Sequence, residues 1–180
     1  RLTRQQWKAE KAAAAATAAS LDRASQADEL MSEIDRDRQT LDEREAALDR
    51  AFLTALDELQ SMEPQERETT LLVIPNTLTS FEDYMLYLQQ AQWLLQRAGL
   101  EGTLQIASFH PHYQFDGTEP SDKENLTNRS PYPILHLIRE ASLEDVLAKY
   151  PEPESIPQNN IDRVESLTSK EISDLFPHLN

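Results

Sequence analysis

Cysteine is absent from the 180 residues of this chain, and only three residues are glycine. Without cysteine the chain can form no disulfide, has no thiolate nucleophile and offers no thiolate ligand to a metal. Any catalysis would therefore depend on histidine, serine, tyrosine or carboxylate groups. The scarcity of glycine excludes most nucleotide-binding loops, which need glycine where the backbone approaches a phosphate.

Basic residues and long apolar runs are also few. The 17 lysines and arginines stand against 32 acidic residues, which gives a formal net charge of -15. Phosphate contacts require a basic surface, so nucleic acid is not an expected partner. No apolar run approaches the length of about 18 residues that marks a membrane-spanning helix. We expect a soluble protein that is peripheral to a membrane complex at most, and no sequence feature indicates a cofactor.

The chain begins at Arg1 rather than methionine, which indicates either processing or a start inside a longer chain. Residues 1–20 carry Arg1, Arg4, Lys8 and Lys11 against the single acid Glu10, among alanine, serine and threonine. This composition resembles the edge of an organellar targeting peptide and favours a plastid or mitochondrion. A solvated, basic, alanine-rich helix end would have the same composition.

A helical arm is expected over residues 1–61, because no glycine or proline interrupts residues 21–60. Ile34, Leu41 and Leu48 recur at intervals of seven and form a thin apolar seam for contact with another protein subunit. Polar residues fill the intermediate heptad positions, so the seam is too sparse to specify a coiled coil. A solvated helix with (i, i+4) ion pairs is the alternative.

An α/β domain is expected over residues 62–180. Two short apolar runs, 69–74 and 103–109, flank a helix that opens at Thr79 and ends near Gly99, which predicts a βαβ crossover with parallel strands. The fold class is therefore α+β, with one small α/β unit and helices at the carboxyl end. Those helices are expected after Ser130, at Ser142 with Asp145, at Pro157, and at Thr168 with Glu171.

The long segment 109–140 is where a functional site is expected. It lacks a periodicity of its own, and such loops are generally functional or disordered. Disordered segments are typically poor in aromatic residues, whereas this one contains Phe109, Tyr113, Phe115 and Tyr132.

Three long stretches resemble an uncharacterised, mainly bacterial family, domain-of-unknown-function family 1415. They read TTLLVIPNTL, GLEGTLQIASFHPHYQFDGTEP and NLTNRSPYPILHLIREASLE, and the resemblance covers about residues 68–167. It implies no established activity. Members of the family usually begin with a helix and a strand around an Asn-Leu-Cys-Pro-Phe motif, in place of which this chain has its acidic arm.

His110 is the candidate general base, because it follows the second predicted strand where α/β sheets place ligand sites. A hydrogen-bonded histidine that orders the loop is the competing interpretation. His110, His112 and His136 are also weak candidates for a three-nitrogen zinc site. Their spacing matches no diagnostic zinc signature.

Five further residues are candidate ligand-binding groups: Tyr113, Asn128, Arg129, His136 and Arg139. On the helix expected after Ser130, His136, Arg139 and Glu140 would share one face. Arg129 and Arg139 would then hold a carboxylate or phosphate by bidentate hydrogen bonds. Alternatively, Arg139 would pair with Asp116 or Asp122 and only fasten the loop.

Two functions are compatible with these features. The first is a non-catalytic accessory or scaffold subunit of a larger assembly, which docks through its helical arm. The second is a protein that binds a small anion or carboxylate, or a hydrolase-like enzyme, with its site in the 109–140 loop.

Overall fold

The computed structural model describes residues 4–179, and the chain divides into two compact units, Arg1–Ala47 and Leu48–Asn180. One helix, α1 (Arg4–Ser61), supplies all of the described part of the first unit and the first turns of the second. The expected long N-terminal helix is therefore confirmed. Its last turns belong to the second unit, which thus begins inside the helix.

Within the first unit, α1 is a solvated helix. Every side chain from 20 to 47 is exposed, and polar side chains one turn apart are joined by hydrogen bonds. Gln26 donates to Asp22 over 3.0 Å, and Gln39 donates to Glu43 over 3.0 Å. Such pairs each stabilise a helix by about 0.2–0.5 kcal/mol.

The second unit adds three strands and several short helices to the end of α1. Its elements are β1 (Thr69–Val73), α2 (Phe81–Arg97), β2 (Leu104–Phe109), the 3₁₀ helix η1 (Lys123–Asn128), β3 (Ile134–Arg139), α3 (Glu140–Leu147), η2 (Pro153–Ser155), α4 (Ile156–Glu165), α5 (Ser169–Leu175) and η3 (Pro177–Leu179). The fold is mixed α+β, as expected.

The sheet is antiparallel, so the predicted parallel strands and βαβ crossover are wrong. Its order is β1-β3-β2, and β3 pairs with both neighbours in antiparallel register. Leu71 and Ala107 both lie opposite His136. Although α2 connects β1 to β2, these two strands never pair, because β3 lies between them.

The segment after Ser130 is a strand, not the predicted helix. Pro133 disfavours helical backbone at the residue before it, and the apolar run 134–138 that follows is short enough for either structure. The neighbouring strands decide the matter, since they bond β3 on both edges. His136 and Arg139 consequently point to opposite faces of the sheet, and the helix face that we expected them to share does not exist.

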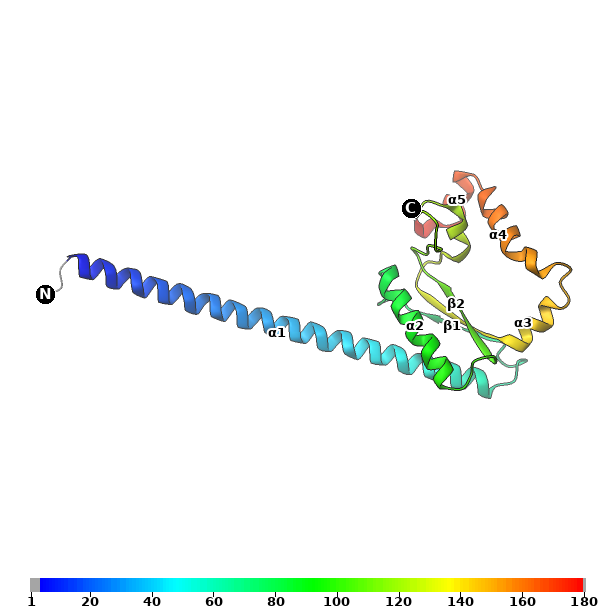
Figure 1. Cartoon of the computed structure of the whole chain (residues 1–180), viewed down its shortest axis with the longest axis horizontal. Coiled ribbons are helices and arrows are strands. Elements are labelled where there is room, and N and C mark those ends of the chain that lie inside the picture. Colours follow the sequence, from blue (N-terminus) through cyan, green and yellow to red (C-terminus); the bar gives the residue numbers. More distant parts are fainter. Residues whose placement is uncertain (1–3, 180) are drawn as a thin grey trace. The chain divides into compact units, whose positions relative to one another are not determined.

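The hydrophobic core lies between one face of the sheet and two helices. The end of α1 and the inner side of α2 (green in Figure 1) cover this face. The fully buried side chains of the core that exceed alanine in size are Phe52, Leu56, Leu59, Tyr84, Leu104, Leu135 and Leu137. Since four residues of α1 (Phe52, Ala55, Leu56 and Leu59) belong to this core, the end of the helix is part of the folded domain.

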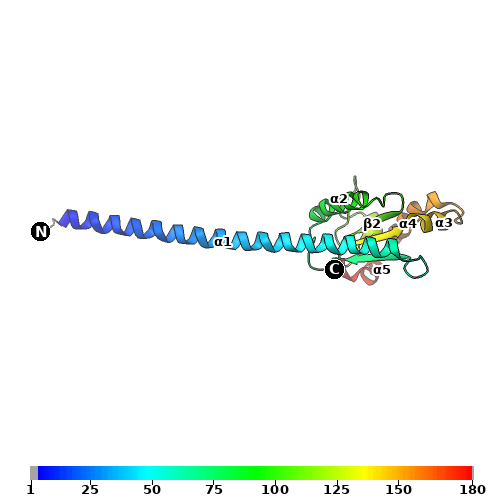
Figure 2. The same ribbon diagram turned by 90° about the horizontal axis from the view of Figure 1, so that it is seen from below.

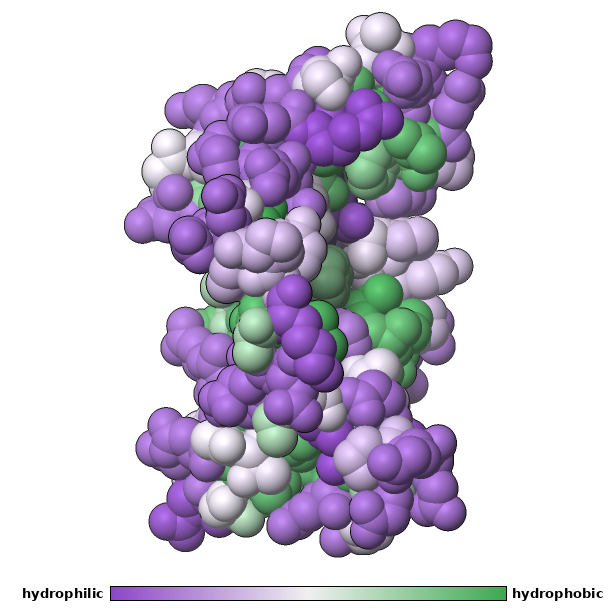
Figure 3. All heavy atoms as spheres, turned by 90° about the vertical axis from the view of Figure 1, so that its right-hand side faces the viewer, coloured by the Kyte–Doolittle hydropathy of each residue, from purple (hydrophilic) through white to green (hydrophobic). Residues whose placement is uncertain are grey.

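The remaining helices pack more loosely. α3 and α4 lie on the side of the sheet away from α2 (Figures 1 and 2), and neither contains a buried residue. On that side of the molecule, apolar side chains reach the surface in patches between hydrophilic ones (Figure 3). In this unit Val146, Tyr150 and Leu175 are among the large apolar side chains that are exposed.

Helix termini match the sequence signals unevenly. Thr168 and Glu171 form the predicted capping box of α5, and Gly99 ends α2 with φ +74°, a conformation that suits glycine. By contrast, Ser80 rather than Thr79 caps α2. α3 begins at Glu140, ahead of the expected Ser142.

In the part of the chain that the structure describes, none of the helices is both long enough and apolar enough to cross a membrane.

Candidate functional site

The loop between β2 and β3 is ordered by its own polar side chains. Asn125, which is fully buried, accepts hydrogen bonds from the backbone N–H of Phe115 and from the Thr118 hydroxyl, both over 2.9 Å. Its amide group donates to the Glu119 carbonyl over 2.8 Å. Asn125 therefore holds together three residues of the loop and leaves no side-chain group for a ligand.

Asn128 connects the loop to the end of β2. Its side chain donates to the Ser108 carbonyl over 3.0 Å and accepts from the Thr127 hydroxyl over 3.2 Å. Its own carbonyl accepts from the backbone N–H of His110 over 3.2 Å. This predicted ligand-binding residue thus makes structural contacts on both sides.

Two cations of the loop bind backbone carbonyls. Arg129 donates to the carbonyls of Tyr113, over 3.3 Å, and Pro120, over 2.6 Å. Lys123 donates to the carbonyls of Glu165 and Leu167 over 3.0 and 2.7 Å. The last carbonyls of a helix carry partial negative charge, so Lys123 also stabilises the end of α4.

His110 is fully buried, and both of its ring nitrogens have partners. Nδ1 accepts from the backbone N–H of His112 over 3.0 Å, so the proton of the neutral ring lies on Nε2. Nε2 then donates to the Leu78 carbonyl over 3.0 Å. A general base needs a free nitrogen beside the substrate, and these contacts give His110 a role in ordering the chain.

The carbonyl that His110 holds belongs to a strained residue. Leu78 has φ +56°, a left-handed conformation that costs a residue with a β-carbon roughly 1–2 kcal/mol. The hydrogen bond from His110 crosses from the end of β2 to the turn before α2 and favours this backbone geometry. The rings of Phe81 and Tyr84 lie 5.4 and 5.1 Å from the imidazole and enclose it.

Tyr84 fastens β2 and β3 from the core. Its hydroxyl donates to the Ile134 carbonyl over 2.8 Å and accepts from the backbone N–H of Phe109 over 3.1 Å. Burial raises the pKa of the phenol well above its ordinary value of 10.0, so Tyr84 stays protonated. The hydroxyl supports the strand ends from which the loop departs.

The three candidate zinc ligands do not form a cluster. His136 contacts the Thr69 hydroxyl through Nε2 over 2.5 Å, whereas His110 is bound to Leu78 and His112 is exposed. Within residues 4–179, no three histidine, aspartate or glutamate side chains are arranged to hold a metal ion.

Arg139 caps the end of α1. Its guanidinium donates to the carbonyls of Leu59, Met62 and Arg67, so it closes the helix and fixes the segment that leads to β1. The expected alternative, a salt bridge to Asp116 or Asp122, is not formed. Because Arg129 and Arg139 each bind backbone oxygens, neither guanidinium is directed at a common anion site.

Tyr113 belongs to an aromatic cluster at the start of the loop. Its ring centroid lies 5.3 Å from that of Phe81 and 5.0 Å from that of Phe115, and its hydroxyl lies 3.4 Å from the Ser108 hydroxyl. Aromatic pairs at such distances stabilise a protein by about 0.5–1.5 kcal/mol beyond their buried area. The aromatic residues that marked this loop in the sequence therefore hold it in place.

One cavity lies beside the loop, between η1, the end of β2 and the start of α4. It has a volume of about 530 Å³, and its walls are Phe109, Phe115, Asp116, Thr118, Glu124, Thr127, Asn128, Ile156, Pro157, Asn160 and Ile161. A volume of this size is in the range of small-molecule sites. Apolar side chains from both the loop and α4 form much of its wall, and its two charged groups are carboxylates.

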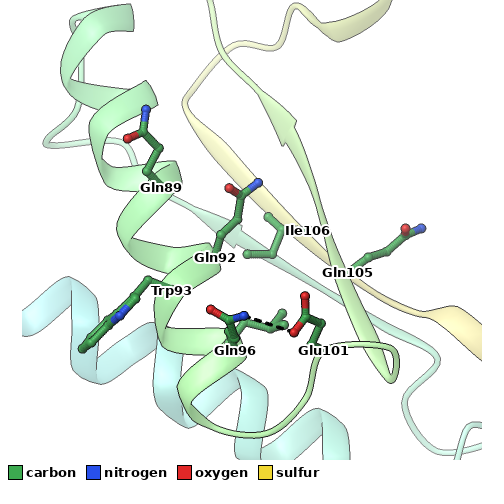
Figure 4. Close-up of a pocket in the computed structure, with 8 residues that line it drawn as sticks. Gln89, Gln92, Trp93, Gln96, Glu101, Gln105 and Ile106 are labelled. Carbon is green, nitrogen blue, oxygen red and sulfur yellow. Dashed lines mark hydrogen bonds between the residues drawn. The ribbon is translucent and has the colours of Figure 1, made fainter.

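A second, open groove runs between α2 and β2 (Figure 4). It has a volume of about 520 Å³ and is lined by four glutamines, with Glu101 as its only charged side chain. Gln96 donates to Glu101 over 3.2 Å, and Trp93 points away from the groove towards solvent. Glutamine amides do not titrate, so this groove offers little acid–base chemistry.

Sequence reasoning missed Asn125 and Lys123 as organisers of the loop, and Tyr84 as its support. Asn125 could have been recognised, because several aromatic residues in its segment predict burial. A polar side chain that is buried with them needs internal hydrogen bonds. Lys123 gave none, because its acceptors lie about forty residues further along the chain.

One buried histidine, His110, and two half-buried ones, His136 and His178, predict a loss of stability in mild acid. Burial lowers the pKa of His110, His136 and His178 below the ordinary value of 6.5. Below pH 6.5 the unfolded chain binds protons that the folded chain does not yet bind, so the free energy of unfolding falls. For His110 the slope reaches at most about 1.4 kcal/mol per pH unit, and the loss stops below its folded pKa.

Urea denaturation at a series of pH values from about 7.5 to about 5 tests this prediction. The variant His110→Gln should be less stable at neutral pH and should show a smaller decrease between those limits. An equal decrease in the variant and the wild type would contradict the role given to His110.

Comparison with known proteins agrees with the resemblance found in the sequence. No curated protein and no solved structure matches the chain. A protein family described as "Protein of unknown function (DUF1415)" matches residues 23–174. The match confirms this family, begins upstream of the resemblance at 68–167, and includes residues 23–61 of the helical arm. The chain belongs to this family of proteins of unknown function.

Proposed function

We propose that this protein is a non-catalytic accessory or scaffold subunit of a larger protein assembly, to which it docks through its helical arm. Leu48, the third residue of the predicted seam, packs against the domain core. The observation that carries the proposal is the apolar stripe of α1, made of Leu30, Met31, Ile34 and Leu41. These four side chains are 50–60% exposed, although they lie on a regular helix. Apolar side chains repeated along one side of a helix gain free energy when a partner covers them, because their surface is then removed from water.

The contacts of the loop support a non-catalytic role. His110, Asn128, Arg129 and Arg139 all bind backbone atoms of the same chain. An enzyme site needs groups whose hydrogen bonds are completed by the substrate. An organellar compartment stays a prediction that rests on the composition of residues 1–20.

One observation favours the small-molecule alternative, namely the cavity of about 530 Å³ beside η1. Its carboxylates, Asp116 and Glu124, would favour a neutral or cationic ligand with an apolar part. The anion that we expected from the sequence would need Arg129 or Arg139, and both are bound to carbonyls.

The size of the assembly in the source cells tests the proposal. We expect the wild-type chain to elute at an apparent mass well above 20.6 kDa, the mass of its monomer. Native mass spectrometry should identify protein subunits bound to it. The double variant Ile34→Asp/Leu41→Asp should elute as a monomer, because charge on the stripe opposes burial.

A matched control places the same charges on the other side of the helix. Ser32 and Gln39 have the same spacing of seven and lie about 200° around α1 from Ile34 and Leu41. Ser32→Asp/Gln39→Asp should leave the assembly intact. A wild-type monomer in the cells would refute the proposal, and a small molecule retained by that monomer would favour the alternative.

A further inference from the structure

The seam that contains Ile34 and Leu41 extends along one side of the arm from residue 17 to residue 45, and its side chains become larger along the helix. Positions spaced alternately by three and four residues lie along one side of a helix. In this arm they are Thr17, Ser20, Ala24, Ala27, Met31, Ile34, Arg38, Leu41 and Glu45, and all of them are exposed. The first four side chains are small, and most of the later ones are large. The seam is therefore poorly suited to pair with itself in parallel register.

A parallel pair of arms would place equal residues opposite each other. Arg38 would then face Arg38, and Glu45 would face Glu45, inside the seam. Like charges in such positions repel, and their desolvation is costly. The small residues would also face each other and leave gaps in the first half of the pair.

Neither problem arises in an antiparallel pair whose two-fold axis passes beside residue 29 of both copies. In this register Met31 faces Ala27 of the second copy, Ile34 faces Ala24, and Leu41 faces Thr17, so each large side chain packs on a small one. Arg38 faces Ser20 instead of another charge. Beside the seam, Arg23 and Asp37 of the second copy lie on the same side of the pair, displaced by two positions or about 3 Å along the helix, and this attractive pair occurs twice by symmetry.

We infer that the arm of this protein pairs in antiparallel register with the arm of a second copy of the chain, so that the exposed apolar stripe is covered by a homodimer contact. The inference rests on the proposed function and names the partner of the stripe. It requires only the described helix between Thr17 and Glu45.

The absence of cysteine allows a direct test with the purified full-length chain. In the proposed register, residues 17 and 41 of the two copies are adjacent, so Thr17→Cys/Leu41→Cys should give a covalent dimer on oxidation or with a short bismaleimide. The same residue in the two copies is displaced by 24 positions, or about 36 Å along the helix. Each single variant, Thr17→Cys or Leu41→Cys, should therefore give no more dimer than the cysteine-free wild type.

Both substituted side chains are exposed, so the variants should fold as the wild type does. Efficient cross-linking of Leu41→Cys alone would overturn the antiparallel register. A monomer by analytical ultracentrifugation at high protein concentration, together with no cross-linking of the double variant, would overturn the homodimer. If the assembly in cells still depended on Ile34 and Leu41, the proposed function would survive that result.

The salt dependence separates a second copy from a basic partner. Residues 21–37 carry six acids against two arginines, so two copies repel each other at their centre. Self-association should become stronger as salt screens this repulsion, whereas binding to a basic helix would become weaker. Weaker self-association in high salt would contradict the pairing that we infer.

Discussion

The substitution Phe52→Ala is expected to lower the free energy of unfolding of the Leu48–Asn180 unit by about 3–5 kcal/mol. Phe52 is fully buried in the core although it belongs to the same helix as the exposed arm. Its removal leaves a cavity between the end of α1, α2 and the sheet. Urea denaturation followed by near-ultraviolet circular dichroism of the buried tyrosines measures the change.

The neighbouring residue provides the control for Phe52. Leu53 lies on the same helical turn but is 41% exposed, so Leu53→Ala should change the free energy of unfolding far less, by about 1 kcal/mol or less. Equal effects of the two substitutions would mean that the end of α1 does not belong to the domain core. The comparison also locates the point along the helix at which solvation gives way to packing.

Replacing Asn125 by alanine has the second large expected effect, a loss of about 2–4 kcal/mol in the free energy of unfolding. The substitution removes the fully buried amide that pairs with the N–H of Phe115, the hydroxyl of Thr118 and the carbonyl of Glu119. Unpaired polar groups of this kind carry a desolvation penalty that no new contact offsets. Limited proteolysis should also cut the variant within residues 110–133 faster than the wild type.

Asn159 is a suitable control for this substitution, because it is exposed and donates only to the Ser155 hydroxyl. Asn159→Ala should stay within about 0.5 kcal/mol of the wild type. If Asn125→Ala were equally neutral and the loop remained resistant to protease, the hydrogen bonds of Asn125 would not be what orders the loop.

The sequence was a reliable guide to the helices whose signals are local. The absence of glycine and proline between residues 21 and 60 predicted the long helix, and the spacing of Thr168 and Glu171 predicted the capping box of α5. These features depend on contacts within one or two turns. Neighbouring residues are enough to specify them.

The sequence failed where the structure depends on distant partners. The run from Ile134 to Ile138 is compatible with a helix or a strand, and only its pairing with β1 and β2 makes it a strand. Arg139 gave the signal of an anion ligand, but its acceptors are carbonyls near the end of α1, up to 80 residues away. A charged residue alone does not reveal whether its partner is a ligand or the backbone of the same chain.

The order of the strands has a consequence for synthesis on the ribosome. Both outer strands pair only with β3, and β3 is the last of the three to be translated. Until about residue 139 has left the exit tunnel, the two earlier strands have no template for their backbone hydrogen bonds. Chains elongate at about 5–20 residues per second, so a nascent chain spends seconds with unpaired β-segments, which chaperones recognise.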